Sequence, residues 1–208
     1  MLADIHIGSY RSGPIINGMN GRLIDIRDRL REISQYVMTN GISHVIILGD
    51  IFKDKNPSPI HLAVFTEFVS LLTEKDVTVI VFPGNHDMHK LQGEVHALKP
   101  FKYLQGQRLQ IIDEPTSIDI GGTNLLIFPY CKSPQREYLP ELLSRGTRGT
   151  SKSILLMHGT VEGAALKGMG DFEIFDEDYI PAEMTDQVLA VFAGHIHEYQ
   201  QFRNVYYP

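Results

Sequence analysis

The segment Gly84-Asn85-His86-Asp87 places three polar side chains in succession just after the apolar run 77–81. The glycine permits a tight turn of the backbone. Asn85 can offer an oxygen to a metal ion, and His86 can give up or accept a proton near neutral pH. A turn of this composition often has no further role, so its interpretation depends on whether other segments end in the same way.

Four other places in the chain offer the same kinds of side chain at or near the end of an apolar segment. Asp4 and His6 are two residues apart, so in an extended segment both side chains point to the same side. His195 and His197 repeat this spacing near the other end of the chain. The complete set of candidate metal-binding side chains is Asp4, His6, Asp50, Asn85, His158, His195 and His197.

The elements that must position these side chains alternate between strands and helices. Apolar runs predict buried strands at 45–48, 77–82, 153–157 and 188–193, and helical spacing of apolar residues predicts a helix over 22–39. Such alternation is typical of an α/β layered sheet, in which ligands lie outside the carboxyl ends of the strands. The other expected elements are a helix from Ser58-Pro59, a hairpin around Gly121-Gly122, a helix over 135–145, a loop over 9–21 and an acidic surface loop over 163–178.

Seven ligand-type side chains are more than one tetrahedral ion needs. They suit two divalent ions that share a carboxylate, an arrangement that stabilises the charge of a phosphoryl group. Oxygen and imidazole donors without thiolate favour manganese, iron or zinc over copper, and manganese is the leading candidate. Magnesium stays open as an alternative. Five unrelated strand ends with polar residues in water would be the competing interpretation.

Composition points to one ordinary globular core. The chain has 208 residues, of which 43% are hydrophobic and 21% charged, with no composition shift that marks a domain boundary. No apolar stretch approaches a membrane span and no signal-type segment is visible, so we expect an intracellular protein. The single cysteine, Cys131, excludes an internal disulfide. The net charge of −6 argues against a surface that binds nucleic acid everywhere, although two bound cations would make one spot positive.

In order and in context, these motifs resemble the motif set of the calcineurin-like metallophosphoesterases. Within that superfamily the chain is most similar to the SbcD-type DNA-repair nucleases of bacteria and phages, which are relatives of the eukaryotic double-strand-break repair nuclease. The resemblance implies a four-layer α-β-β-α sandwich. The residues that carry it are Asp4-x-His6, Gly49-Asp50, Gly84-Asn85-His86-Asp87, His158-Gly159 and Gly194-His195-x-His197.

The resemblance also implies a role for each side chain. His86 would be the general acid for the leaving oxygen, and adjacency suggests that Asp87 orients His86 through a hydrogen bond. Lys53 stands where relatives carry histidine or an acidic residue, so it is interpreted either as a substrate phosphate contact or as a solvated loop charge. One ion would be held by Asp4, His6, Asp50 and His197, and the other by Asn85, His158 and His195, with Asp50 bridging them.

The function implied by the resemblance is a manganese-dependent DNA phosphodiesterase of repair or recombination. It would act as a 3′–5′ exonuclease on duplex DNA and as an endonuclease on single strands, in the cytoplasm and in association with the nucleoid. Its expected partners are DNA and an SMC-like ATPase subunit of the SbcC type, with a homodimer also open and no membrane contact. Residues 1–208 would form one nuclease domain without the capping and ATPase-binding regions of such enzymes.

Two other classes of function stay open. The first is a phosphatase or phosphodiesterase for small nucleotides or phosphoproteins, which fits the acidic net charge better. The second is a metal-binding scaffold that assembles a partner complex. His86 argues against the scaffold, because a scaffold needs no general acid.

Overall fold

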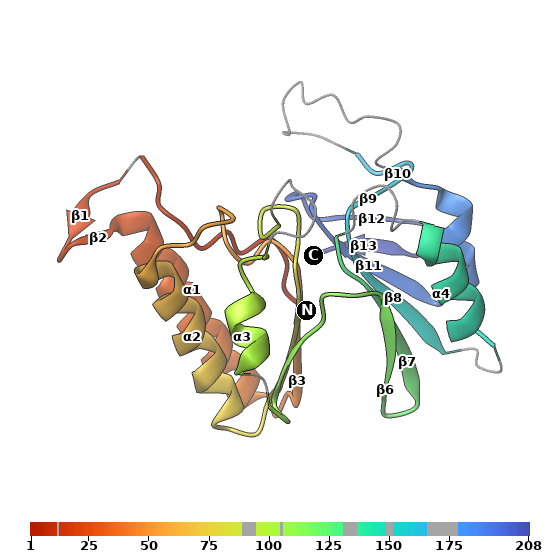
Figure 1. Ribbon diagram of the computed structural model, residues 1–208, viewed down its shortest axis with the longest axis horizontal. Coiled ribbons are helices and arrows are strands. Elements are labelled where there is room, and N and C mark those ends of the chain that lie inside the picture. Colours follow the sequence, from red (N-terminus) through yellow and green to blue (C-terminus); the bar gives the residue numbers. More distant parts are fainter. Residues whose placement is uncertain (12, 89–94, 105, 131–136, 149–151, 166–178) are drawn as a thin grey trace.

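The computed structural model describes residues 1–208 except for 12, 89–94, 105, 131–136, 149–151 and 166–178. Within the described residues, two β-sheets face each other and helices cover their outer faces (Figure 1). This arrangement is the α-β-β-α sandwich that the family resemblance implies, and it confirms the α/β fold class.

The first sheet is parallel and has the strand order β3-β4-β5. It consists of β3 (His44–Leu48), β4 (Thr78–Phe82) and β5 (Leu109–Ile111). Every residue of β4 is buried, as expected for a parallel strand that has helices on one face and a second sheet on the other. The helices on the outer face, on the left in Figure 1, are α1 (Gly21–Thr39), α2 (Pro59–Thr73) and α3 (Lys99–Tyr103).

The second sheet has the order β12-β13-β11-β8-β7-β6 in the described part of the chain. Its central strands run parallel, and hairpin-like antiparallel pairs close both edges. Its strands are β6 (Thr116–Ile120), β7 (Thr123–Phe128), β8 (Ser153–His158), β11 (Ala190–Gly194), β12 (Gln200–Phe202) and β13 (Val205–Tyr207). Its outer face packs against α4 (Tyr138–Gly146) and a 3₁₀ helix (Ala182–Gln187).

Strand side chains alternate between the layers of the sandwich. In β8, Leu156 joins the cluster between the two sheets, whereas Leu155 and Met157 join the cluster under α4. In β3, Ile46 faces the second sheet and Ile47 faces the helices of the first. This period of two lets each apolar strand bury both of its faces. The polar residues that follow the strands are therefore left at the strand ends.

The loop predicted over 9–21 contains a short hairpin, so that prediction is wrong in part. Its strands are β1 (Ile15–Ile16) and β2 (Met19–Asn20). Asn17 and Gly18 form its turn with φ angles of 51° and 80°, as type I′ turns require. Two-residue strands leave no periodic signal. A second small pair, β9 (Thr160–Val161) with β10 (Tyr179–Ile180), is parallel and was also not predicted.

The hairpin around Gly121-Gly122 and the helix over 22–39 are confirmed. The helix predicted over 135–145 is confirmed from Tyr138 onward as α4, and its first two residues lie outside the described part. Cys131 and residues 166–178 of the predicted acidic loop lie outside it too. Among the described residues, no helix is both long and apolar enough to cross a membrane.

Candidate active site

The candidate ligands converge at the carboxyl ends of strands from both sheets. Asp50 follows β3 and Asn85 follows β4 in the first sheet. His158 ends β8, and His195 directly follows β11, in the second sheet. The site therefore lies where the edges of the two sheets meet, as the rule for open α/β sheets predicts.

The first group of side chains gathers Asp4, His6 and His197. The Nε2 atoms of His6 and His197 are 3.0 Å apart, and Asp4 Oδ1 lies 3.8 Å from His197 Nε2. One ligand atom from each of these residues lies within 4.8 Å of the others. A carboxylate oxygen and two imidazole nitrogens at this separation can bind one divalent ion.

The second group is centred on Asn85. Its Oδ1 atom lies 2.9 Å from His158 Nε2 and 2.9 Å from His195 Nδ1. His158 Nδ1 donates a hydrogen bond to the carbonyl of Leu48 at 2.7 Å, which turns Nε2 of that imidazole toward the site. An amide oxygen and two imidazoles form a second donor set that suits a divalent ion.

Asp50 lies between the two groups. Its Oδ2 atom is 3.7 Å from His6 Nε2 in the first group and 3.5 Å from His158 Nε2 in the second. Its Oδ1 atom accepts a hydrogen bond of 2.8 Å from the backbone N–H of His86. One carboxylate oxygen thus faces both groups, which is the placement expected of a ligand shared by two ions.

The backbone at the ligands is strained. Asp4, His6 and Asp50 have φ angles of 52°, 50° and 50°, and His195 has 100°. Residues other than glycine avoid this left-handed region at a cost on the order of 1–3 kcal/mol each, and such residues concentrate at functional sites. The segment 4–6 is accordingly not a regular strand, and the expectation of an extended segment there is wrong. Its side chains converge all the same. Asp4 accepts a hydrogen bond of 3.0 Å from the N–H of His195 at both carboxylate oxygens, and His6 Nε2 lies 3.0 Å from His197 Nε2.

Glycines leave room for the ligands to pack. A Cβ atom on Gly84 would overlap the backbone nitrogen and the carboxylate of Asp50, and one on Gly194 would overlap the carbonyl oxygen of Leu48. Gly49 has a φ of 86°, and a Cβ there would overlap His158. These three glycines therefore allow close packing beside the candidate ligands.

Replacing Gly84 with alanine is expected to lower the free energy of unfolding by about 1–3 kcal/mol, because the new methyl group has to displace Asp50. Urea denaturation monitored by circular dichroism measures the change. Gly106→Ala is the matched control, since no atom lies within 4 Å of a Cβ at that position. Equal stability of the two variants would contradict the packing role of Gly84.

Asp87 lies beneath the site and is fully buried. Its carboxylate accepts hydrogen bonds from the backbone N–H groups of Gly84 at 2.9 Å, Phe52 at 2.9 Å and Ile51 at 3.2 Å. Burial, reinforced by the charge of Asp50, raises the pKa of Asp87 to about 7 despite these bonds. Through its three hydrogen bonds, Asp87 joins the turn after β4 to the segment after β3.

The backbone of Lys53, and not Asp87, orients His86. The Nδ1 atom of His86 lies 2.8 Å from the carbonyl oxygen of Lys53, to which it can donate. The predicted hydrogen bond from Asp87 to His86 is wrong, because the carboxylate is turned toward three backbone N–H groups of other residues. With Nδ1 engaged, Nε2 of His86 is the nitrogen left to face a substrate. A ring nitrogen of His86 lies within 4.8 Å of ligand atoms of His6 and Asp50, so a metal-binding role is the alternative.

Burial and charge set the pKa values of the ligands. Burial lowers the pKa of His6 and of His195 to about 4, so both imidazoles are neutral near neutral pH and can offer a lone pair. Burial also raises the pKa of Asp50. The charge of His158 and the hydrogen bonds that Asp50 accepts from His158 and from the His86 N–H outweigh this effect and hold the pKa of Asp50 at about 2. In return, Asp50 raises the pKa of His158 to about 9 against the effect of burial. Because a metal ligand must be deprotonated, binding of a metal ion by His158 would release a proton.

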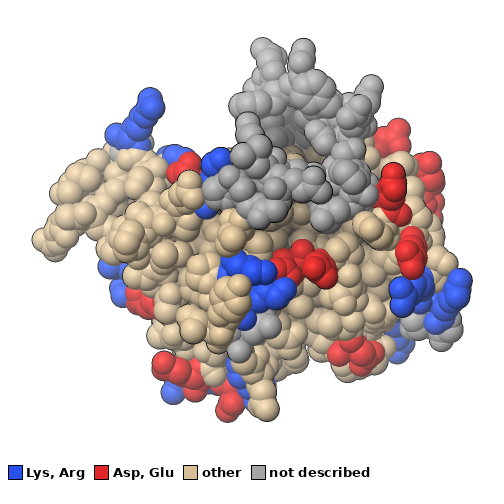
Figure 2. Space-filling model, in the orientation of Figure 1, with Lys and Arg blue, Asp and Glu red and all other residues tan. Residues whose placement is uncertain are grey.

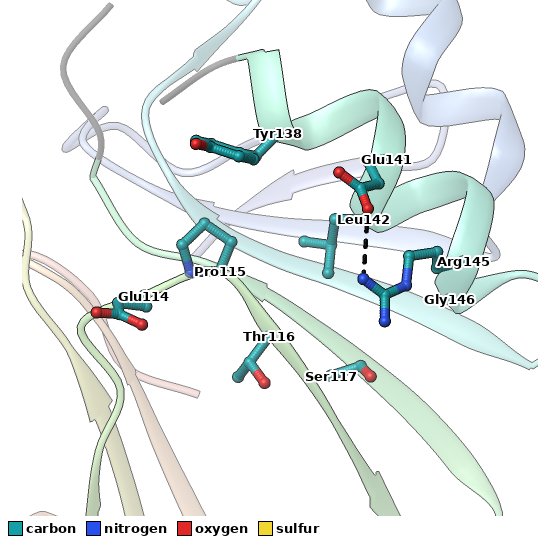
Figure 3. A pocket seen from close by; sticks show the side chains of 9 residues that line it. All are labelled: Glu114, Pro115, Thr116, Ser117, Tyr138, Glu141, Leu142, Arg145 and Gly146. Carbon is teal, nitrogen blue, oxygen red and sulfur yellow. Dashed lines mark hydrogen bonds and ion pairs between the residues drawn. The ribbon is translucent and has the colours of Figure 1, made fainter. Parts of the chain in front are cut away.

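A cavity of about 740 Å³ opens from the first group of ligands along α1. His6, His86 and His197 line the end of this cavity at the site. A second cavity of about 850 Å³ lies between the start of β6 and α4, beside the ion pair of Glu141 with Arg145 (Figure 3). The described residues that line this second cavity include none of the predicted site residues.

The comparison with known proteins agrees with the fold. The sequence profile of the calcineurin-like phosphoesterases matches residues 1–199, and the chain therefore belongs to the calcineurin-like phosphoesterase family. Members of this family bind divalent metals, and the Asp and His groups described above are candidates for that role. The family assignment supports a metal-dependent hydrolase.

Several curated relatives are DNA-processing proteins by name. Exonuclease subunit 1 of Enterobacteria phage T4 is 25% identical over 99% of this chain and 57% of its own length. The DNA double-strand break repair protein Mre11 of Sulfurisphaera tokodaii is 25% identical over 96% of this chain and 50% of its own length. Mre11 of Methanocaldococcus jannaschii is 26% identical over 76% of this chain and 42% of its own length. The chain thus spans about half the length of the curated relatives it matches.

Proposed function

We propose that this chain is a two-metal phosphodiesterase that hydrolyses DNA. The observation that carries the proposal is the position of Asp50, whose Oδ2 atom lies within 3.7 Å of an imidazole nitrogen in each of the two ligand groups. The names of the relatives support DNA as the substrate. We further propose manganese as the metal, 3′–5′ exonuclease activity on duplex DNA, endonuclease activity on single strands, and a role in repair or recombination.

Each of the two groups of side chains would hold one metal ion, and Asp50 would be shared between the two ions. When bound, the two ions supply Lewis-acid stabilisation of the phosphoryl oxygens and activate water. Asp50 carries the negative charge that two adjacent cations need, because its pKa stays at about 2. The first ion would be held by Asp4, His6, Asp50 and His197, and the second by Asn85, His158, His195 and the shared Asp50.

His86 supplies the proton for the leaving oxygen in this proposal. His86 lines the cavity in which a substrate would lie, and its Nδ1–H group is fixed on the carbonyl of Lys53, so the transferred proton comes from Nε2–H of the imidazolium form. A general acid in this position lets the leaving oxygen depart as a hydroxyl group instead of as an alkoxide.

The proposed function includes binding partners. We propose that residues 1–208 act as one catalytic domain, with DNA and an SMC-like ATPase subunit of the SbcC type as partners. On the face shown in Figure 2, basic and acidic side chains lie close together in several places. An acidic chain with such a mixed surface is expected to bind DNA through a localised set of cations near the site.

The proposal is tested with the purified chain and a 3′-labelled DNA duplex, beside bis-p-nitrophenyl phosphate as a small diester. With manganese we expect both substrates to be hydrolysed, and we expect EDTA to abolish both reactions. Hydrolysis of the small diester alone would favour a phosphodiesterase for small nucleotides. Bound metal without hydrolysis of either substrate would favour a metal-binding scaffold.

A further inference from the structure

Two cationic side chains share the ring of Tyr10 at the edge of the site. The guanidinium carbon of Arg22 lies 4.6 Å from the ring centroid, and the Nζ atom of Lys53 lies 4.2 Å from it. Both distances are within the range of cation–π attraction. The aromatic ring thus holds two positive charges, each within 4.6 Å of its centroid.

This cluster is fixed to the segment that carries the first ligands. The hydroxyl of Tyr10 donates a hydrogen bond of 2.8 Å to the carbonyl of His6, and Lys53 Nζ donates one of 3.1 Å to the carbonyl of Ser9. The Cβ atom of Lys53 packs where Gly8 has no side chain. The positions of the Tyr10 ring and of Lys53 are therefore set before any ligand arrives, and Arg22 contacts the ring so placed.

The charges of Arg22 and Lys53 are not balanced by ion pairs. Elsewhere on α1, arginines pair with carboxylates, as Arg29 does with Glu32 at 2.5 Å and Arg31 with Glu67 at 2.5 Å. Within the described residues, neither Arg22 nor Lys53 forms such a pair. Two carboxylates are nearby without pairing with them: Asp25 lines the same cavity, and the charge of Asp54 acts on Tyr10. Arg22 also lies in the first turn of α1, where the helix dipole disfavours a cation. Such an arrangement is stabilised when an anion joins it.

The cluster and the candidate active site share one cavity. Tyr10, Arg22 and Lys53 line the same space of about 740 Å³ as His86 and His197. Lys53 also contacts His86 directly through its backbone carbonyl. An anion bound by the two cations would therefore lie next to a phosphoryl group at the metal ligands.

We propose that Arg22 and Lys53, held on the ring of Tyr10, form a subsite for a second phosphate group of a nucleic-acid strand, adjacent to the phosphate that is cleaved. This inference rests on the proposed function and adds to it a preference for substrates with more than one phosphate. The contact is made to the phosphate and is independent of base sequence.

The salt dependence of DNA binding tests the subsite. Binding of a fluorescent single-stranded oligonucleotide is measured in EDTA, which prevents turnover, between about 50 and 200 mM salt. For Arg22→Gln we expect weaker binding. The slope of log affinity against log salt concentration should become less negative by about 0.7, the value for one lost phosphate contact to a single strand. Arg22→Lys keeps the charge and is expected to restore most of the slope. Arg145→Gln, which removes an exposed arginine on α4, is the matched control and should bind as the wild type does.

Hydrolysis gives a second readout. The ratio of kcat/KM for the oligonucleotide to kcat/KM for bis-p-nitrophenyl phosphate is expected to fall about tenfold in Arg22→Gln, because only the longer substrate offers a second phosphate. If the wild type cleaves DNA while Arg22→Gln shows its slope and its ratio unchanged, the subsite is refuted and the proposed function stands. If the wild type neither binds nor cleaves DNA, the proposed function fails and the subsite fails with it.

Discussion

Replacing Asp50 with asparagine is expected to reduce hydrolysis of both DNA and bis-p-nitrophenyl phosphate at least about 10³-fold, since the loss of even one charge-stabilising group costs 10²–10³. Asparagine keeps the shape of the side chain and can still accept the hydrogen bond from the His86 N–H through Oδ1. What it loses is the negative charge that faces His6 and His158. We therefore expect the metal content, measured by mass spectrometry, to fall below two ions per chain.

Asp76→Asn is the matched control for this substitution. Asp76 also has a positive φ, 62° against 50° for Asp50, and its side chain is 87% exposed. The same chemical change in the same backbone conformation is thus made away from the site, and it should leave activity and metal content as they are. An Asp50→Asn chain with full metal content and near-normal activity would remove the shared carboxylate from the mechanism.

Replacing His86 with alanine is expected to lower kcat on DNA by about 10²–10⁴-fold, the usual contribution of a positioned general acid. Bis-p-nitrophenyl phosphate needs little protonation of its leaving group, so its hydrolysis should fall much less. Metal content should stay near that of the wild type, because Nδ1 of His86 is engaged by the Lys53 carbonyl and lies outside the proposed ligand sets.

Three results separate the roles open to His86. A loss confined to DNA supports the general acid, whereas an equal loss on both substrates indicates that His86 stabilises the phosphoryl charge instead. Loss of bound metal would make it a ligand, which its nearness to His6 and Asp50 allows. His44→Ala is the control, since His44 is an exposed histidine at the start of β3, the end of that strand away from the site.

The longer apolar strands were predictable from local signals, and the convergence of the candidate ligands was predictable from the parallel arrangement of those strands. Apolar runs specify buried strands, and the polar residues at the carboxyl ends of β3, β4, β8 and β11 come together because parallel strands present these ends at one edge. The glycines beside the ligands were visible too. Their reason, close packing against Asp50 and His158, is a tertiary contact that appears only in the structure.

The partners of Asp87 and the cluster at Tyr10 could not be predicted in this way. Asp87 bonds to Phe52, which is 35 residues away, and nothing in the local sequence of either residue records that contact. Tyr10 lies in a segment with only two-residue strands nearby, where periodicity has no length over which to act. Left-handed backbone at Asp4 and His6 is likewise imposed from outside the segment, by bonds to the chain around Gly49 and Asp50.

The carboxylate of Asp4 bonds to the backbone of His195 across 191 residues of sequence, and this has a consequence for the order of folding. Contacts between such distant residues have a large loop-closure cost and tend to form late. Either half of the sandwich can collapse on its own cluster of apolar residues before the two edges meet. Catalytic competence is then the last property that the chain acquires during folding and the first that it loses during unfolding, so hydrolysis should disappear at lower urea concentration than helical circular dichroism does.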